Sequence, residues 1–293
     1  MKASFSSLLV LSLCVSRALA DDPKIVRDVP YAEPAHERQK LDIYTPTGAN
    51  KAPVVFWIHG GGWQTGDKGP LHYKPALFTG RGMVLVSTNY RLLPDVDMGT
   101  IIRDVAKSLA WVHNHIVEYG GDPQRIFIMG HSAGAQLAAI IAADDRYLKA
   151  EGISPEILIG CVPVDGDTYD VPLMVKVGED RRKAEGKPEP KFGHRAKFGT
   201  PEQHVEYSAA LQCKSDKYIA PFLLLHVAAH PDVTQQAKRL AEELVKAGKS
   251  ATLFGADDTD HVKLNANLGA PDDPATKSLN TFLDDVLKKH PSR

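Results

Sequence analysis

Cysteine, net charge and long apolar runs are all scarce in this sequence. With three cysteines among 293 residues, the chain has no disulfide framework, and a chain of this length can bury a large core without one. A formal net charge of −1 gives no indication of a nucleic-acid-binding protein. Repeats, low-complexity tracts and clear linkers are also missing, so the length fits one large α/β domain or two small ones.

The first twenty residues are typical of a secretory signal peptide. Lys2 gives a positive start, residues 8–15 are apolar, and residues 18–20 fit a small-x-small cleavage site. The apolar segment is too short to span a bilayer. We therefore expect residues 1–20 to be removed on export, and residues 21–293 to form one domain that is secreted or periplasmic. The alternative is a frayed apolar N-terminus.

Two cysteines, Cys161 and Cys213, lie outside this N-terminal segment. Cys161 falls in an apolar run, which favours a buried core position. Export would allow the two to pair, and the sequence leaves that question open.

Apolar segments of strand length alternate with helical patterns through most of the chain. Apolar residues at steps of three and four predict helices near residues 101–116, 237–244 and 279–286. This alternation predicts an α/β fold with a mostly parallel sheet covered by helices on both faces. Residues 24–44 contain two short extended segments that predict an edge hairpin. The other predicted strands are 54–58, 84–88, 126–129, 157–162, 222–227 and 251–254.

Residues 172–206 interrupt this alternation. The segment is polar, contains several glycines and prolines, and has more lysine and arginine than aspartate and glutamate. A long irregular segment in a compact domain is usually a functional loop. We therefore predict a cap or a loop that flanks the site, the alternative being a solvated surface excursion.

Two glycine-rich motifs follow predicted strands. In "GHSAG" (130–134), Ser132 stands where an apolar run meets an alanine-rich helical segment. This context predicts a nucleophile elbow, a tight strand-to-helix turn that exposes the serine hydroxyl at a helix N-terminus. In "HGGG" (59–62) the three glycines carry no side chains, so the backbone amides of this loop can approach a developing oxyanion. The alternatives are a glycine-flanked surface serine and a flexible glycine turn.

With these motifs, the sequence resembles the α/β-hydrolase superfamily, in particular the HGGG-type esterases related to hormone-sensitive lipase and to secreted feruloyl and acetyl esterases. The stretches that carry the resemblance are "LDIYTP" (41–46), "VVFWIHGGGWQTGDK" (54–68), "VSTNYRL" (86–92), "GGDPQRIFIMGHSAGAQLAA" (120–139) and "PFLLLHVAAHPD" (221–232). The resemblance implies an acyl-serine mechanism without a cofactor. It makes Ser132 the nucleophile, and it assigns the oxyanion hole to the amides of Gly61, Gly62 and Ala133.

The family's chain order of serine, acid and histidine directs the search for the base to the C-terminal part. His261 lies in a polar loop after the last predicted strand, and we predict that it is the base. His131 is expected to pack beside the nucleophile, and His226 to be buried and hydrogen-bonded at a strand end. His194 and His204 lie in the interrupting segment and could line the site.

The acid is harder to place, because many relatives carry it at the position that His230 occupies here. The next carboxylate, Asp232, lies in a turn between a predicted strand and helix, and the resemblance to the feruloyl-type branch implies an acid in such a turn. We predict Asp232 as the acid, with helix capping as its alternative role. Asp257, Asp258 and Asp260, in the loop of His261, and Asp165, after an earlier strand, are the rivals.

These assignments predict a secreted serine carboxylic ester hydrolase that acts on short-acyl, acetyl or hydroxycinnamoyl esters, including esters linked to polysaccharide. The alternatives are an arylformamidase-like amidohydrolase with the same triad and a catalytically silent binding module of the same fold. The scattered histidines predict no metal site, since His113 and His115 are two apart in a helical pattern and face different ways.

Overall fold

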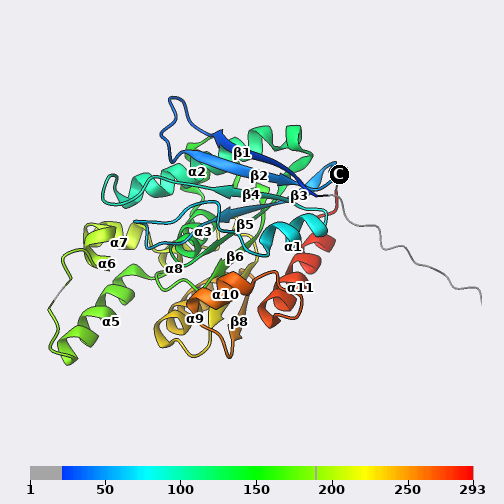
Figure 1. Cartoon of the computed structure of the whole chain (residues 1–293). Coiled ribbons are helices and arrows are strands. Elements are labelled where there is room, and N and C mark those ends of the chain that lie inside the picture. Colours follow the sequence, from blue (N-terminus) through cyan, green and yellow to red (C-terminus); the bar gives the residue numbers. More distant parts are fainter. Residues whose placement is uncertain (1–21, 189, 293) are drawn as a thin grey trace, which may run out of the picture.

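In the computed structural model, which describes residues 22–188 and 190–292, eight strands form one sheet in the order β1-β2-β4-β3-β5-β6-β7-β8 (Figure 1). The strands are β1 (Lys24–Pro30), β2 (Lys40–Thr45), β3 (Ala52–Ile58), β4 (Val84–Thr88), β5 (Gly121–His131), β6 (Leu158–Val164), β7 (Phe222–Val227) and β8 (Ala251–Ala256). Strands β1, β2 and β4 pair antiparallel, and every other neighbouring pair is parallel. The predicted hairpin and all six further predicted strands are therefore confirmed.

Helices connect the parallel strands, and three of them match the predicted helical patterns. The helices are α1 (Lys74–Gly80), α2 (Met98–His115), α3 (Ala133–Ala143), α4 (Arg146–Ala150), α5 (Val171–Ala184), α6 (His194–Phe198), α7 (Pro201–Glu206), α8 (Ala209–Gln212), α9 (Pro231–Lys246), α10 (His261–Asn267) and α11 (Pro274–Lys289). Two short 3-10 turns, Ile116–Tyr119 and Pro155–Ile157, precede β5 and β6.

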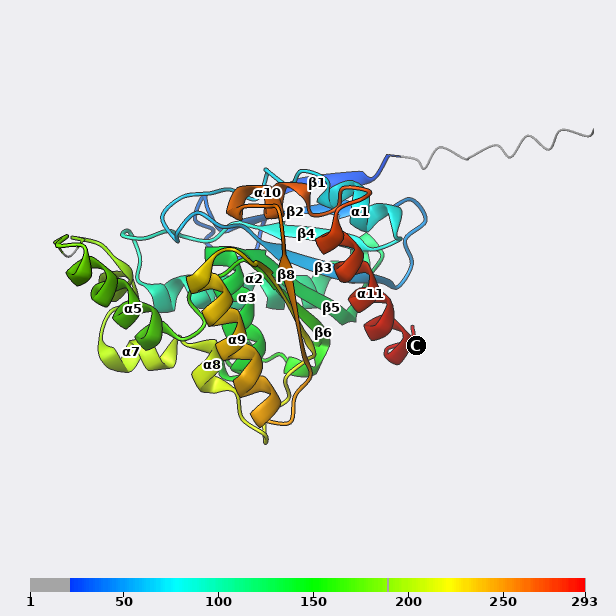
Figure 2. The ribbon, with the colours of Figure 1, turned by 90° about the horizontal axis from the view of Figure 1, so that it is seen from below.

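The sheet is covered on both faces, as the alternation predicted. Along β3, Val54, Phe56 and Ile58 join one core with α2, α3 and α9, whereas Val55 and Trp57 join a second core with α1, α10 and α11. Figure 2 shows the first group of helices on one side of the sheet and α11 on the other. Because successive side chains of a strand point to opposite faces, one apolar strand supplies both cores.

The segment 172–206 is mostly helical rather than irregular, so the loop prediction is wrong in its secondary structure. Helix α5 begins at its N-cap Asp170, whose carboxylate accepts from the Leu173 amide at 3.1 Å. Helix α7 begins with a capping box between Thr200 and Gln203. The sequence does not predict α5 because the helix buries only a few residues, near its start, so its apolar periodicity is weak. Figure 1 shows α5, α6 and α7 together at one end of the molecule, projecting away from the sheet.

The N-terminal predictions have a separate outcome. The predicted signal peptide, residues 1–20, lies outside the described residues and stays a prediction. In the described ranges, no helix combines the length and apolarity that a membrane span requires.

The two cysteines of the described ranges do not form a disulfide. Cys161 is buried and Cys213 half-buried, and both are unpaired thiols.

Candidate active site

Ser132 lies at the sharp turn between β5 and α3. Its backbone has φ 56° and ψ −119°, a conformation that a residue with a side chain rarely adopts. The Ser132 amide donates to the Val164 carbonyl at the end of the neighbouring strand, at 2.9 Å. The turn is therefore fixed to the sheet, and the strain is of the kind that clusters at functional sites.

The two glycines of the turn are required by close backbone contacts. A Cβ on Gly130 would lie 2.3 Å from the Gly134 carbonyl oxygen, and one on Gly134 would lie 2.2 Å from the Ile58 carbonyl oxygen. No side chain fits at these distances. The glycines let α3 begin directly against the ends of β3 and β5.

The HGGG loop lies against this turn. A Cβ on Gly60 would lie 3.0 Å from the Ser132 Cβ. Gly61 and Gly62 have φ values of +117° and +60°, which glycine adopts without strain. Ala133 is the first residue of α3, so its amide is among those that have no acceptor within the helix. Backbone amides of two loops thus approach the serine from neighbouring strand ends.

His59 anchors the start of the HGGG loop. Its Nδ1–H donates to the Gly60 carbonyl at 2.7 Å, and Arg38 donates to its Nε2 at 3.2 Å. Tyr90 stacks on the imidazole with ring centroids 4.4 Å apart. Burial lowers the pKa of His59 to about 4, so the ring is neutral and its contacts hold the loop without adding charge to the site.

His261, the first residue of α10, is bound to Asp165. Its Nδ1–H donates to the Asp165 Oδ2 at 2.6 Å, and Asp165 Oδ1 accepts from the Val227 amide at 2.7 Å. The hydrogen bond that His261 donates to Asp165 raises the pKa of His261 above its ordinary value. Burial opposes ionisation of Asp165, but the bonds from His261 and Val227 outweigh it and lower the pKa of that carboxyl.

The prediction that Asp232 pairs with His261 is therefore corrected. Asp232 lies in the first turn of α9 and forms an ion pair with Arg181 of α5. The first turn of a helix favours a carboxylate, which is close to the capping role considered as its alternative. Asp165 follows β6 as Ser132 follows β5, and the strand ends pair His131 with Val164. Asp165 and Ser132 therefore follow neighbouring strand ends at the carboxyl edge of the sheet.

His131 packs against His261, whereas the prediction placed it beside Ser132. Its Nε2–H donates to the His261 carbonyl at 3.0 Å, and the two ring centroids are 4.4 Å apart. Burial, together with the neighbouring His261, lowers the pKa of His131 to about 3. The ring is neutral with its proton on Nε2, so it serves as a donor to α10.

The other candidate histidines lie elsewhere. His226 is buried at the end of β7, as predicted, but its Nδ1 has no hydrogen-bond partner among the described residues, contrary to the prediction. His204 is buried and donates to the Arg195 carbonyl at 3.1 Å, a contact within the α6–α7 region. His194 lies edge-on to Trp63 with centroids 5.9 Å apart. The segment 171–206 therefore reaches the residue that follows the HGGG motif.

One cavity is lined by several of the predicted site residues. It has a volume of about 460 Å³, and its lining includes Ser132, His261, Gly61, Gly62 and Asn265. Ser132, His261 and the HGGG glycines thus open onto the same space.

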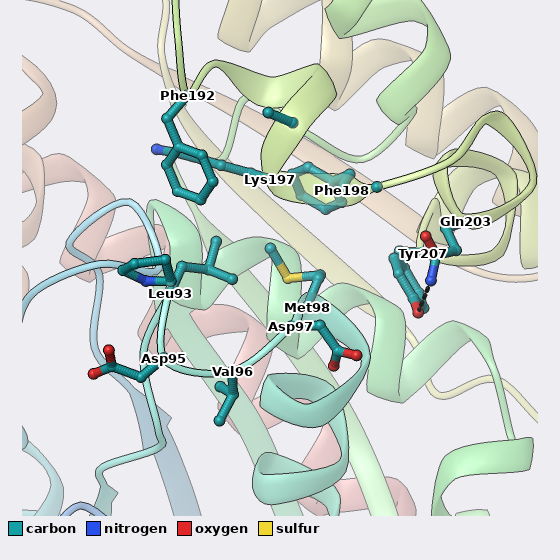
Figure 3. A pocket seen from close by; sticks show the side chains of 13 residues that line it. Leu93, Asp95, Val96, Asp97, Met98, Phe192, Lys197, Phe198, Gln203 and Tyr207 are labelled. Carbon is teal, nitrogen blue, oxygen red and sulfur yellow. Dashed lines mark hydrogen bonds between the residues drawn. The ribbon is translucent and has the colours of Figure 1, made fainter.

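A second cavity of about 320 Å³ lies between α6 and the loop after β4. In Figure 3, Phe192, Lys197 and Phe198 lie on one side of it, with Leu93 and Met98 opposite. Apart from Lys197, these side chains give this part of the cavity an apolar lining.

Lys197 lies between the two cavities. Its Nζ donates to the Gly62 carbonyl at 3.3 Å and stands 5.5 Å from the centre of the Trp63 ring. Burial lowers the pKa of Lys197 below its ordinary value. The second cavity therefore begins one side chain away from the HGGG loop.

A family match agrees with this geometry. The BD-FAE family matches residues 41–244, a span that contains the HGGG loop, Ser132 and Asp165. The chain belongs to the BD-FAE family. Like the α/β-hydrolases it resembles, this BD-FAE member has a mostly parallel sheet with the nucleophile motif after a central strand. His261 lies beyond the matched span, so its pairing with Asp165 comes from the structure alone.

Solved structures and sequence relatives extend the comparison. A truncated carbohydrate esterase from gut microbiota has a TM-score of 0.72 and 19% identity, with 92% of this chain and 98% of that chain covered. Esterase B of Lactobacillus rhamnosis has a TM-score of 0.69 and 21% identity, with 93% and 88% covered. These likenesses show the α/β-hydrolase fold.

Esterase LipQ of Mycobacterium tuberculosis is 38% identical over 128 residues, which is 42% of this chain and 30% of that protein. The isoprenylcysteine alpha-carbonyl methylesterase ICME of Arabidopsis thaliana is 31% identical over 134 residues, which is 45% of this chain and 31% of that protein. The chain thus spans less than a third of the length of these two relatives.

Proposed function

We propose that this protein is a serine carboxylic ester hydrolase that works through an acyl-serine intermediate. The observation that carries the proposal is the pairing of His261 with Asp165 in a cavity that Ser132 also lines. Asp165 occupies Nδ1 of the imidazole, which leaves Nε2 as the nitrogen that can accept a proton. Relatives named as esterases support the same reaction class.

The proposed reaction has two halves. Ser132 Oγ attacks the acyl carbon as its proton passes to His261 Nε2, and the carbonyl electron pair moves to the oxygen. The amides of Gly61, Gly62 and Ala133 stabilise this oxyanion, each contributing roughly 3 kcal/mol. Collapse expels the alcohol, which takes the proton from Nε2, and water then releases the acid by the same sequence.

The position of His261 also orients the ester. Since Nε2 must protonate the leaving oxygen, the alcohol occupies the cavity that His261 lines. The acyl group points away from His261, past the oxyanion loop and Lys197, toward the second cavity. We propose short-acyl, acetyl or hydroxycinnamoyl esters as substrates, including those of polysaccharides that an exported enzyme would meet.

A substrate panel with a covalent probe tests the proposed function. We expect a fluorophosphonate to label the wild-type protein on Ser132, and p-nitrophenyl esters of graded chain length to be hydrolysed. Feruloyl and acetylated-sugar esters and N-formylkynurenine complete the panel, with Ser132→Ala as the blank. Absence of labelling would favour a silent binding protein, and preference for the formamide over every ester would favour an amidohydrolase.

A bulky residue in the second cavity is expected to shorten the acyl preference. Ala196 of α6 is exposed and lines this cavity, so Ala196→Phe fills it without removing a contact. Each buried methylene contributes about 0.8 kcal/mol, or roughly fourfold in rate. We expect kcat/KM for p-nitrophenyl hexanoate to fall about tenfold or more relative to acetate.

The matched control is Ala184→Phe, the same substitution at the exposed end of α5. We expect this variant to keep the wild-type ratio of hexanoate to acetate hydrolysis. Equal chain-length profiles for Ala196→Phe and the wild type would show that the acyl group lies elsewhere.

A further inference from the structure

A lysine without a carboxylate partner is buried beside the catalytic cavity. Lys74, the first residue of α1, is 0% exposed. Its Nζ donates to the Asn265 carbonyl at 2.7 Å and stands 4.6 Å from the centre of the Trp57 ring. No carboxylate within the described ranges forms an ion pair with it. Lysine is almost never fully buried unless it is paired, because burying a charge is costly.

The helix that Lys74 contacts is the one that carries His261. Helix α10 has seven residues, too few to be stable without tertiary contacts. The Asn265 carbonyl is among its last four, which lack a donor within the helix. The amide four residues on, that of Gly269, donates to Thr276 Oγ1 at 2.7 Å instead. Lys74 Nζ therefore supplies the missing donor, and its protonated form adds a positive charge at the helix C-terminus, where it is favourable.

The other end of α10 is held independently. The Asp260 carboxylate accepts from the Val262 and Lys263 amides at 3.0 and 2.8 Å, and His131 donates to the His261 carbonyl. These bonds hold the first turn, and Lys74 holds the last. A short helix fixed at both ends cannot rotate His261 away from Asp165.

We propose that Lys74 is a positioning residue that acts through α10 to keep the His261 imidazole aligned between Asp165 and Ser132. The inference rests on the proposed function of Ser132 and His261. Trp57 and Asn265 line the catalytic cavity, whereas Lys74 lies behind them and does not line it. It therefore affects the geometry of the base and does not touch the substrate.

Replacing Lys74 by methionine separates positioning from simple structural support. Lys74→Met keeps the side-chain length and removes the donor and the charge. We expect kcat for p-nitrophenyl acetate to fall about 10- to 100-fold, because misplacement of a catalytic group by about 1 Å costs up to about 100-fold. KM should stay within about twofold, and the melting temperature should be unchanged or higher, because an unpaired buried charge is gone.

The pH dependence of stability gives a second readout. Burial lowers the pKa of Lys74 from its ordinary 10.5 to about 7, so between these values the unfolded chain binds more protons than the folded one. Wild-type stability therefore gains from rising pH in this window, and the cost of the buried charge is present in full below about pH 7. His131, on β5, is an ionisable group whose pKa, about 3, is lowered in part by Lys74, so it stays neutral in this window. We expect the melting-temperature difference between Lys74→Met and the wild type to shrink from pH 7 to pH 9.

Two further variants complete the test. Lys263→Met places the same substitution on an exposed site of α10, where its ion pair with Asp260 is solvated, and it should keep wild-type kcat. Lys74→Gln restores a neutral donor and should recover part of the lost kcat.

The outcomes separate this inference from the proposed function. A folded Lys74→Met protein with wild-type kcat, or one that melts lower or fails to fold, would overturn the positioning role in favour of a structural one. Failure of the proposed function would appear differently, as ester turnover that persists in Ser132→Ala.

Discussion

Replacing Ser132 by alanine is expected to remove ester turnover while leaving the fold intact. Alanine keeps the Cβ that lies against Gly60 and meets the same backbone strain at φ 56°. It lacks the oxygen that would attack the acyl carbon. Loss of a catalytic serine in a well-studied protease costs about 10⁶ in kcat. We expect a fall of at least about 10⁴ in kcat for p-nitrophenyl acetate.

Circular dichroism and thermal melting provide the control for this substitution. The melting temperature of Ser132→Ala should match that of the wild type within a few degrees. A purified, folded Ser132→Ala protein that hydrolyses esters at the wild-type rate would remove Ser132 from the mechanism.

Replacing Asp165 by asparagine is expected to have the second largest effect. Asparagine can still accept from the Val227 amide, so the loop should keep its position. It cannot hold the proton on His261 Nδ1 or stabilise the imidazolium. In a serine protease the equivalent change costs about 10⁴ in kcat. We expect kcat to fall by at least about 100-fold, with little change in KM.

The pH profile of the same variant should also move. His261 acts as a base when it is neutral, so activity is lost as pH falls through its pKa, which Asp165 raises above 6.5. Loss of the carboxylate lowers that pKa. The acidic limb of the kcat/KM profile of Asp165→Asn should therefore shift to lower pH.

Asp232→Asn is the matched control for the acid. The substitution weakens an ion pair between the buried Asp232 carboxylate and Arg181, whose side chain is half exposed, and it leaves the bond between His261 and Asp165 unchanged. We expect kcat within about twofold of the wild type. If Asp232→Asn loses activity while Asp165→Asn keeps more than a tenth of it, the assignment reverses.

Most of the fold could be predicted from the sequence because the signals are local. Buried parallel strands need near-continuous apolar runs, and all six runs became strands. The turn around Ser132 could be predicted because its glycines are required by backbone contacts that any strand-to-helix turn of this kind makes. The structure also brings His261 to the cavity that Ser132 and the HGGG glycines line.

The acid could not be predicted by the same reasoning. Its position depends on which strand end lies within reach of His261, and 96 residues separate Asp165 from the base. The turn after β7 offered Asp232, but α9 begins there and that carboxylate pairs with Arg181 of α5. One signal favoured Asp165: it follows the buried run of β6 directly, as Ser132 follows that of β5. Helices α5–α7 were missed because they bury few residues, so their apolar periodicity is weak.

The bond between Asp165 and the Val227 amide has a consequence for how this protein can be altered. It joins the carboxyl ends of the parallel strands β6 and β7, and the Asp165 amide also donates to the Leu225 carbonyl at 2.7 Å. Asp165 is therefore fixed by the sheet at the point where the chain leaves β6 toward helices α5–α8. Helices α5–α7 can be exchanged for those of a relative without displacing the acid, which makes this region a natural unit for grafting new substrate preferences onto an unchanged catalytic frame.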